Sequence, residues 1–178
     1  MSKYTQQQIV TADGSLAAPA EFTMAYLQQQ IEGIAQFPSD LEAVLKPLSK
    51  ELLNTPYRDG GWTLNQVVHH IADSHMQAFA RFKLTLTEDN PVIKPYHQDL
   101  WVTTADCNID TSVSLDLIKA LHIRFVAIMK SLSESDFKKE YIHPEYKRNF
   151  SLAFVTGMYA WHGYHHLQQI SMFLENQI

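Results

Sequence analysis

Apolar residues recur every three to five positions in four long segments of the chain, the spacing of an amphipathic α-helix. These segments cover about residues 21–48, 62–87, 112–131 and 151–175. Pro38 interrupts the first segment and Ser39 is a good N-cap, so one kinked helix and two separate helices fit it equally well. Four long amphipathic helices predict an all-α four-helix bundle.

Turn-forming residues and prolines mark the connections between these helices. Residues 54–61 form a loop, and residues 88–110 form a long crossover of the kind that caps a site or crosses a fold. A short turn begins at Ser133, and residues 141–150 are expected to be irregular or hairpin-like. We expect an extended N-terminal arm, residues 1–20, followed by a single domain, residues 21–178.

The fourth helix carries two histidines, His162 and His166, one helical turn apart on its apolar face. A pair of imidazoles on a buried stripe needs hydrogen-bond partners or a metal to offset the cost of leaving water. Taken alone, the pair favours ordinary core histidines over a metal site. A third ligand from another helix would reverse that preference.

Histidines of the second and third helices are the candidates for a third ligand. His75 and His122 lie inside apolar stripes, His70 lies at the edge of one, and His69 lies on the far side. The spacing leaves the choice open among His70, His75 and His122. A mostly polar stripe that includes His70 and Arg81 runs beside the apolar face of the second helix, as a cleft lining would.

Composition narrows the class of protein. Apolar residues make up 46% of the 178 residues and charged residues 19%, which is typical of a globular chain. The net charge is −5 and no basic stripe is present, so nucleic acid is not an expected partner. The sequence has one cysteine, no apolar leader and no run near the roughly 18 apolar residues of a membrane span. These features predict a cytoplasmic protein.

Several segments resemble the YfiT-like branch of the DinB superfamily. They are Thr55–Met76, Arg81–Pro91, Lys94–Tyr96 and Trp161–His166, in the family's order. The likeness extends from about Pro38 to the C-terminus, while residues 1–37 do not match clearly. Such proteins are four-helix bundles that bind a divalent metal through one histidine of helix two and an H-x-x-x-H pair of helix four.

The resemblance selects among the open candidates. In the wider superfamily the helix-two ligand stands eight residues after a tryptophan and just before Leu or Ile, and Trp62, His70 and Ile71 match that pattern. The resemblance therefore implies His70, His162 and His166 as ligands of one divalent ion. Zinc and nickel are the expected ions, although an all-imidazole set also suits iron and copper.

Three neutral imidazoles leave open coordination positions, as in catalytic metal centres. Zinc bound in this way lowers the pKa of its water to about 7 and would also deprotonate a thiol. No catalytic base is assigned, although four side chains could approach the metal: His75, His143, Tyr164 and His165. Asp73 is a nearby carboxylate but is expected to be exposed. Arg81 and Tyr96 are candidates for binding the anionic end of a substrate.

The resemblance implies a metal-dependent hydrolase that acts on a small molecule, and a homodimer. One alternative is a thiol S-transferase that uses a low-molecular-weight thiol such as bacillithiol. A second alternative is a metal-stabilised stress-response bundle without turnover, whose coordination sphere would be closed by a fourth protein ligand.

Overall fold

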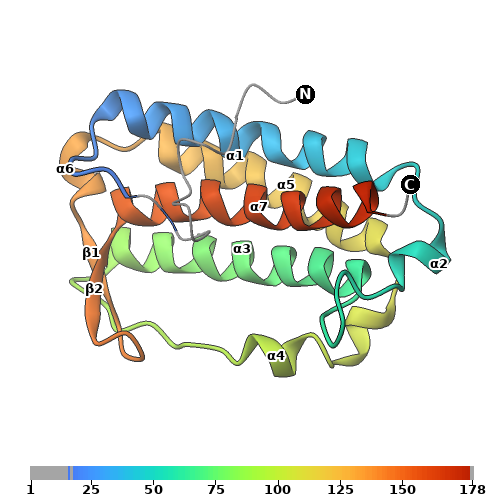
Figure 1. Ribbon diagram of the computed structural model, residues 1–178. Helices are drawn as coiled ribbons and strands as arrows, with labels where there is room; N and C mark the ends of the chain where they lie inside the picture. The colour runs from blue at the N-terminus through green and yellow to red at the C-terminus, as the bar shows by residue number, and fades with distance from the viewer. Residues whose placement is uncertain (1–15, 17, 177–178) are drawn as a thin grey trace.

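Four long helices form the body of the computed structural model, which describes residue 16 and residues 18–176 (Figure 1). They are α1 (Met24–Leu45), α3 (Leu64–Thr87), α5 (Thr111–Lys130) and α7 (Leu152–Glu175). Helix α1 packs against α5 and α7, and α3 packs against the same two helices. The four-helix bundle is therefore confirmed. Most of the expected N-terminal arm lies outside the described residues.

Polar residues at the N-termini fix where the long helices begin. Thr23, Thr63, Asp110 and Ser151 each accept a hydrogen bond from a backbone N–H of the first turn. Thr63 also forms a capping box with Gln66, whose side chain accepts from the Thr63 N–H at 2.9 Å. Each such cap stabilises a helix by about 1 kcal/mol, so the starts follow from local sequence.

Helix α1 runs without a break through Pro38, which decides between the one-helix and two-helix interpretations. A proline inside a helix has no N–H to donate to the carbonyl four residues earlier. In α1 that carbonyl belongs to Ile34, and it accepts instead from Nδ1 of His122 on α5 at 2.7 Å. The helix therefore continues because a side chain replaces its missing hydrogen bond.

The connections contain short elements. They are α2 (Lys50–Leu53), α4 (Gln98–Trp101), η2 (Ala105–Asn108), α6 (Glu134–Phe137), β1 (Glu140–His143) and β2 (Arg148–Ser151). Strands β1 and β2 form an antiparallel hairpin in which His143 is opposite Arg148. The segment that was expected to be irregular or hairpin-like is therefore a hairpin. Val92, at the start of the long crossover, forms an isolated bridge with Ile142 of β1.

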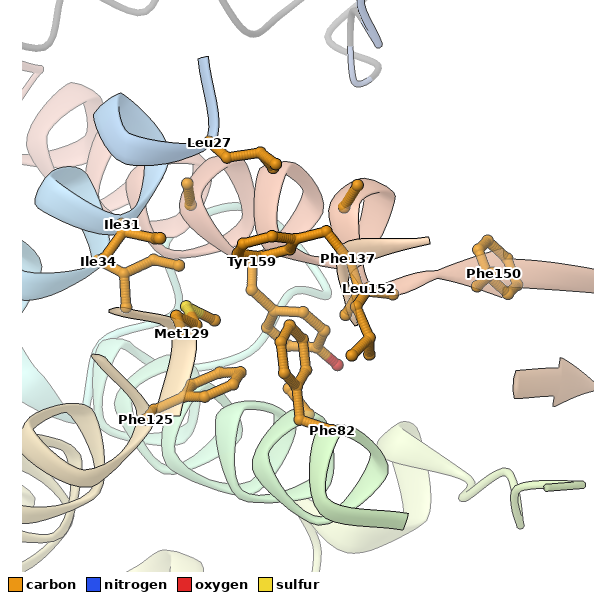
Figure 2. Close-up of a cluster of buried hydrophobic side chains, with 14 of the residues drawn as sticks. Leu27, Ile31, Ile34, Phe82, Phe125, Met129, Phe137, Phe150, Leu152 and Tyr159 are labelled. Carbon is orange, nitrogen blue, oxygen red and sulfur yellow. The ribbon is translucent and has the colours of Figure 1, made fainter. Parts of the chain in front are cut away.

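Two apolar clusters fill the bundle along its length. In the cluster of Figure 2, Phe82 of α3, Phe125 of α5 and Tyr159 of α7 are almost fully buried, and the Phe82 and Phe125 rings meet edge to face at 4.9 Å. Burying each large apolar side chain contributes about 1.5–3 kcal/mol. None of the helices in residues 18–176 combines the length and apolarity needed to cross a membrane.

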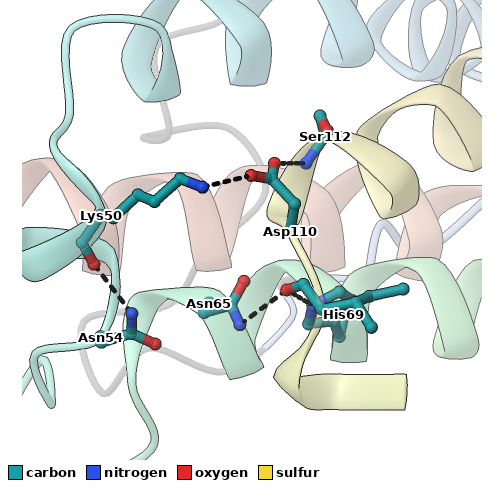
Figure 3. Close-up of polar contacts among 7 residues, drawn as sticks. Lys50, Asn54, Asn65, His69, Asp110 and Ser112 are labelled. Carbon is teal, nitrogen blue, oxygen red and sulfur yellow. Dashed lines mark hydrogen bonds and ion pairs between the residues drawn. The ribbon is translucent and has the colours of Figure 1, made fainter.

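The long crossover is fastened to the first turns of α3. The Asn65 side chain donates to the carbonyls of Cys107 and Ile109 at 3.1 and 3.2 Å, and the Gln66 side chain donates to Val102 at 3.1 Å. Figure 3 shows Asn65 and His69 directed at this segment. These bonds hold residues 98–110 over the end of the bundle that carries His70.

Candidate metal centre

His70 of α3 and His162 and His166 of α7 converge between their two helices. One ring nitrogen of each lies within 4.8 Å of the others. The Nε2 atoms of His70 and His162 are 3.3 Å apart, and the three ring centroids are 4.6–5.3 Å from one another. The structure thus brings together the three histidines that the family resemblance implied.

The arrangement fits a divalent metal ion. Two imidazole nitrogens bound to one zinc ion at about 2.0–2.1 Å in tetrahedral geometry lie about 3.4 Å apart, close to the separation of the His70 and His162 nitrogens. Neutral imidazoles suit zinc, nickel and copper. In residue 16 and residues 18–176, no fourth His, Cys, Asp or Glu joins the cluster, so ligand positions stay open to small molecules.

Burial keeps the three rings neutral. Desolvation lowers the pKa of His70 to about 4 and that of His166 to about 3, with neighbouring histidines adding to the effect at His166. Desolvation likewise lowers the pKa of His162 well below its ordinary value. At neutral pH each ring therefore offers an unprotonated nitrogen, the form that binds metals.

A chain of hydrogen bonds fixes which nitrogen of His162 is unprotonated. Nδ1 of His122 must carry hydrogen because the Ile34 carbonyl can only accept. Nε2 of neutral His122 therefore accepts from Nδ1 of His75 at 2.8 Å, and Nε2 of His75 accepts from Nδ1 of His162 at 3.2 Å. The Nε2 lone pair of His162 is left facing His70.

A second side chain fixes His166 in the same way. Nδ1 of His166 lies 2.8 Å from Oε1 of Gln169, which can only accept, so Nε2 of His166 is unprotonated. The amide of the same Gln169 donates to His165 at 3.0 Å. Outer partners of this kind orient metal-binding histidines and raise their basicity. The sequence interpretation missed Gln169, although its place three residues after His166 on a helix was a usable signal.

The remaining candidates have other surroundings. Nδ1 of His69 lies 2.7 Å from the Ser114 hydroxyl, and the Tyr164 hydroxyl donates to Asp40 at 2.8 Å. Asp73 is half-buried rather than exposed, and desolvation together with Asp106 raises its pKa to about 6. In the described residues Asp73 makes no hydrogen bond to the three central histidines. His75 is instead the hydrogen-bond partner of His162, and Gln169 is that of His166.

Two clefts reach the centre. One, of about 420 Å³, lies beside His70, His162 and His166 and is lined also by Trp62, Trp161 and His165. The other, of about 910 Å³, meets it at His162 and extends past Ser74 to Arg81 and Tyr96. Of the polar stripe predicted for the second helix, His70, Ser74 and Arg81 thus line clefts, and Arg81 and Tyr96 line the larger cleft together.

The fold and this site define a four-helix bundle with a three-histidine cluster suited to a divalent ion. A family model described as the DinB superfamily matches residues 34–170, and this chain belongs to that superfamily. YfiT from Bacillus subtilis, described as a probable metal-dependent hydrolase with an unusual four-helix bundle topology, superposes with a TM-score of 0.90. It is 36% identical, over 92% of this chain and 94% of that one.

Curated relatives have similar names. A protein from Oceanobacillus iheyensis is 42% identical over 158 residues, which span 89% of this chain and 91% of the relative. One from Geobacillus thermodenitrificans is 43% identical over 158 residues, spanning 88% and 89%. Both carry the name "Putative metal-dependent hydrolase".

Proposed function

We propose that this protein is a metal-dependent hydrolase of a small molecule, with one divalent ion held by His70, His162 and His166. The observation that carries the proposal is the convergence of three neutral imidazoles, within 4.8 Å of one another, where two clefts meet. The names of the relatives support the same activity. The donor set favours zinc or nickel.

An ion in this place would lower the pKa of a water molecule and polarise a substrate carbonyl. The chain's own residues hold the rings: His75 and His122 orient His162, and Gln169 orients His166. Arg81 and Tyr96 are proposed to bind the anionic end of the substrate in the larger cleft. His165 and His143 line the clefts, and the catalytic base stays unassigned.

Metal content measured by elemental mass spectrometry tests the ligand set. The full-length protein, purified without a histidine tag, is expected to hold about one zinc or nickel ion per chain, and His70→Ala and His162→Ala to hold none. His165→Ala is the matched control, because His165 lies beside the cluster without joining it. Stoichiometric metal in His70→Ala would overturn the assignment. Ester and amide panels then test hydrolysis with each loaded protein.

The meeting of two clefts at His162 favours a second candidate, a thiol S-transferase, because two substrates could reach the ion from different sides. A low-molecular-weight thiol would then occupy one cleft and an electrophile the other. Turnover that requires added thiol supports the transferase, and turnover indifferent to thiol supports the hydrolase. A stress-response bundle without turnover would show neither.

The homodimer and the cytoplasmic location implied by the sequence stay predictions. Sedimentation equilibrium of the full-length protein across a hundredfold range of concentration tests the first. A single species with the mass of one 20.4 kDa chain would contradict the homodimer.

A further inference from the structure

The larger cleft contains an unusual concentration of polar atoms without partners. In residue 16 and residues 18–176, five buried side-chain nitrogen or oxygen atoms make no hydrogen bond, and three of them belong to residues lining this cleft. They are Nε of Arg81, the hydroxyl of Tyr141 and Nδ1 of His143. Buried polar atoms in native proteins almost always have partners, so three orphans in one cleft indicate a missing acceptor.

Arg81 is the strongest of the three indications. Its side chain is 7% exposed, and in the part of the chain that the structure describes it forms no ion pair. A buried charge without an opposite charge beside it costs several kcal/mol and is retained where it binds something. The guanidinium offers a planar fork of donors that matches a carboxylate.

Phenol rings surround this guanidinium. Burial raises the pKa of Tyr141, and raises that of Tyr96 to about 12. The charge of Arg81 lowers both, and the nearness of the Tyr141 hydroxyl to the Arg81 guanidinium lowers the pKa of Tyr141 further. Burial also raises the pKa of Tyr159. These hydroxyls therefore stay protonated; those of Tyr96 and Tyr159 lie beside Ser74, while that of Tyr141 has no hydrogen-bond partner and can donate. With His143, whose pKa burial and Arg81 lower, they form a wall of neutral donors around one cation.

We propose that Arg81, Tyr141 and His143 form a subsite for a carboxylate group, so that the substrate is a carboxylic acid whose reactive bond reaches His162. The charges of the cleft favour a monoanion over a phosphate dianion. Arg148 at the rim faces two exposed carboxylates, Glu145 and Asp99, so the rim adds no excess positive charge and Arg81 is the buried cation of this cleft.

The same geometry sets the length of the substrate. Arg81 follows His70 by eleven residues, three helical turns or about 16 Å along α3, on nearly the same face. Both side chains lean toward the N-terminus, so only the longer reach of the arginine shortens the gap, which stays on the order of 10 Å or more. The carboxylate and the reactive bond are therefore separated by several bonds, as in an acyl derivative of a medium-chain acid rather than of glycine.

Binding of an aromatic carboxylate tests the subsite apart from the metal site. The probe is 4-phenylbutyrate, with 4-phenylbutyramide and 3-phenylpropyl phosphate as comparisons. Each is titrated into full-length, ¹⁵N-labelled protein loaded with zinc and into the His162→Ala variant, and the Nε–H signal of Arg81 is followed by NMR. The subsite predicts that the carboxylate shifts this signal in both proteins and that the amide does not.

Variants separate binding from structure. Arg81→Met should weaken binding at least fiftyfold and Tyr141→Phe about tenfold. Neither should lower stability much, because Nε of Arg81 and the Tyr141 hydroxyl have no hydrogen-bond partner and Arg81 has no ion pair to lose among the described residues. Arg124→Met, which removes an exposed arginine lying over the Phe79 ring, is the matched control and should bind as the wild type does.

Three results would overturn the proposal: unchanged affinity in Arg81→Met, binding that needs zinc and is lost in His162→Ala, or phosphate binding as tight as carboxylate binding. The reaction that the subsite would serve rests on the proposed function, but carboxylate binding at the subsite does not. Carboxylate binding in His162→Ala, together with no metal in the wild-type protein, would sink the metal proposal and leave the subsite standing.

Discussion

At the scale of residues, five of the nine histidines form one connected network that runs from the Ile34 carbonyl to the cluster between α3 and α7. Each inner hydrogen bond has one possible direction, because the carbonyl at the end of the chain can only accept. His75 and His122 therefore act on the cluster through His162 rather than as members of it.

Replacing His122 should weaken metal binding even though His122 does not touch the cluster. His122→Leu removes the acceptor for His75, so the tautomer of His162 is no longer fixed, and loss of such an outer partner costs about 10–100-fold in affinity. His122→Gln can donate to Ile34 and accept from His75, so it should restore most of the loss. Zinc affinity is measured by competition with a chelating dye, and the tautomer by ¹⁵N shifts of the ring nitrogens.

The control for this prediction is His69→Leu. His69 is also buried, but it contacts Ser114 and the Ile109 carbonyl, outside the network. Its replacement should lower stability and leave zinc affinity within about twofold, far from the 10–100-fold loss of an outer partner. Equal zinc affinities in His122→Leu and the wild type would show that the chain does not orient His162.

Asp73 should make stability depend on pH. Its pKa is raised from 3.8 to about 6, so the folded state binds this proton more tightly than the unfolded state does. The resulting stabilisation is complete below pH 3.8 and is lost as the pH rises through 6. At pH 7.5 Asp73→Asn should therefore be more stable than the wild type, by about 1 kcal/mol after discounting for partial exposure.

Urea unfolding at pH 7.5 and pH 4.5 measures this effect. The advantage of Asp73→Asn should shrink at the lower pH, while Asp89→Asn, at an exposed position, should change stability little at either pH. If Asp73→Asn raised the free energy of unfolding equally at both pH values, the charge of the Asp73 carboxylate would not be the cause.

The sequence located part of this residue network. His162 and His166 share a helix, so their relation follows from spacing alone. Spacing left the third ligand open among His70, His75 and His122, since that choice depends on how α3 and α5 pack against α7, and only the family resemblance selected His70. The pairing of His75 with His122 is likewise long-range, because the two lie 47 positions apart and meet only when α3 packs against α5.

At the scale of elements, the four long helices begin within about three residues of the predicted positions because their caps are local. The partner order of the helices was not predictable, since it depends on side-chain shape along whole faces. Gly163 is one such determinant. A Cβ there would lie 3.0 Å from the ring of Phe37, which stacks on His75 and His122 at centroid distances of 5.8 and 5.7 Å.

Gly163→Ala should therefore destabilise the bundle although alanine is the better helix former. The helix gains about 1 kcal/mol, while overpacking of a core ring costs typically 1–3 kcal/mol, so a net loss of up to about 2 kcal/mol is expected. Chemical denaturation measures the change. The displaced Phe37 ring should also alter the ¹⁵N shifts of His75 and His122.

Gly157→Ala is the matched substitution on the same helix. Its Cβ would meet the hydroxyl of Tyr26 at 2.6 Å, the far end of a partly exposed side chain that can rotate away. This variant should be neutral or stabilised by up to about 1 kcal/mol. Similar losses in the two variants would contradict the role given to the Phe37 contact.

At the scale of the whole molecule, the histidine cluster joins α3 to α7, two elements that are far apart in the sequence. The long crossover, fastened to α3 by Asn65 and Gln66, places Gln98 and Asp99 where the two clefts meet. The sequence indicated from its length that this crossover would cap a site or cross the fold. Which residues it would place there depended on the bonds to α3.

Metal binding at the cluster should stabilise the entire bundle, because the unfolded chain does not hold the three histidines together. At a free zinc concentration one hundred times the dissociation constant, the gain is about 2.7 kcal/mol. For a chain of this length that corresponds to a rise in melting temperature on the order of 5–10 °C. Differential scanning calorimetry with zinc and with a chelator measures the shift.

The rise in melting temperature should vanish in His162→Ala. It should persist in His165→Ala, because the His165 ring stacks on Trp161 outside the cluster. A rise of the same size in His162→Ala would assign the stabilisation to zinc bound elsewhere on the surface. The His162→Ala and His122→Leu variants are also expected to differ. His162→Ala deletes a ligand and should abolish the zinc effect, whereas His122→Leu weakens the site without deleting a ligand and should only move the effect to higher zinc concentrations.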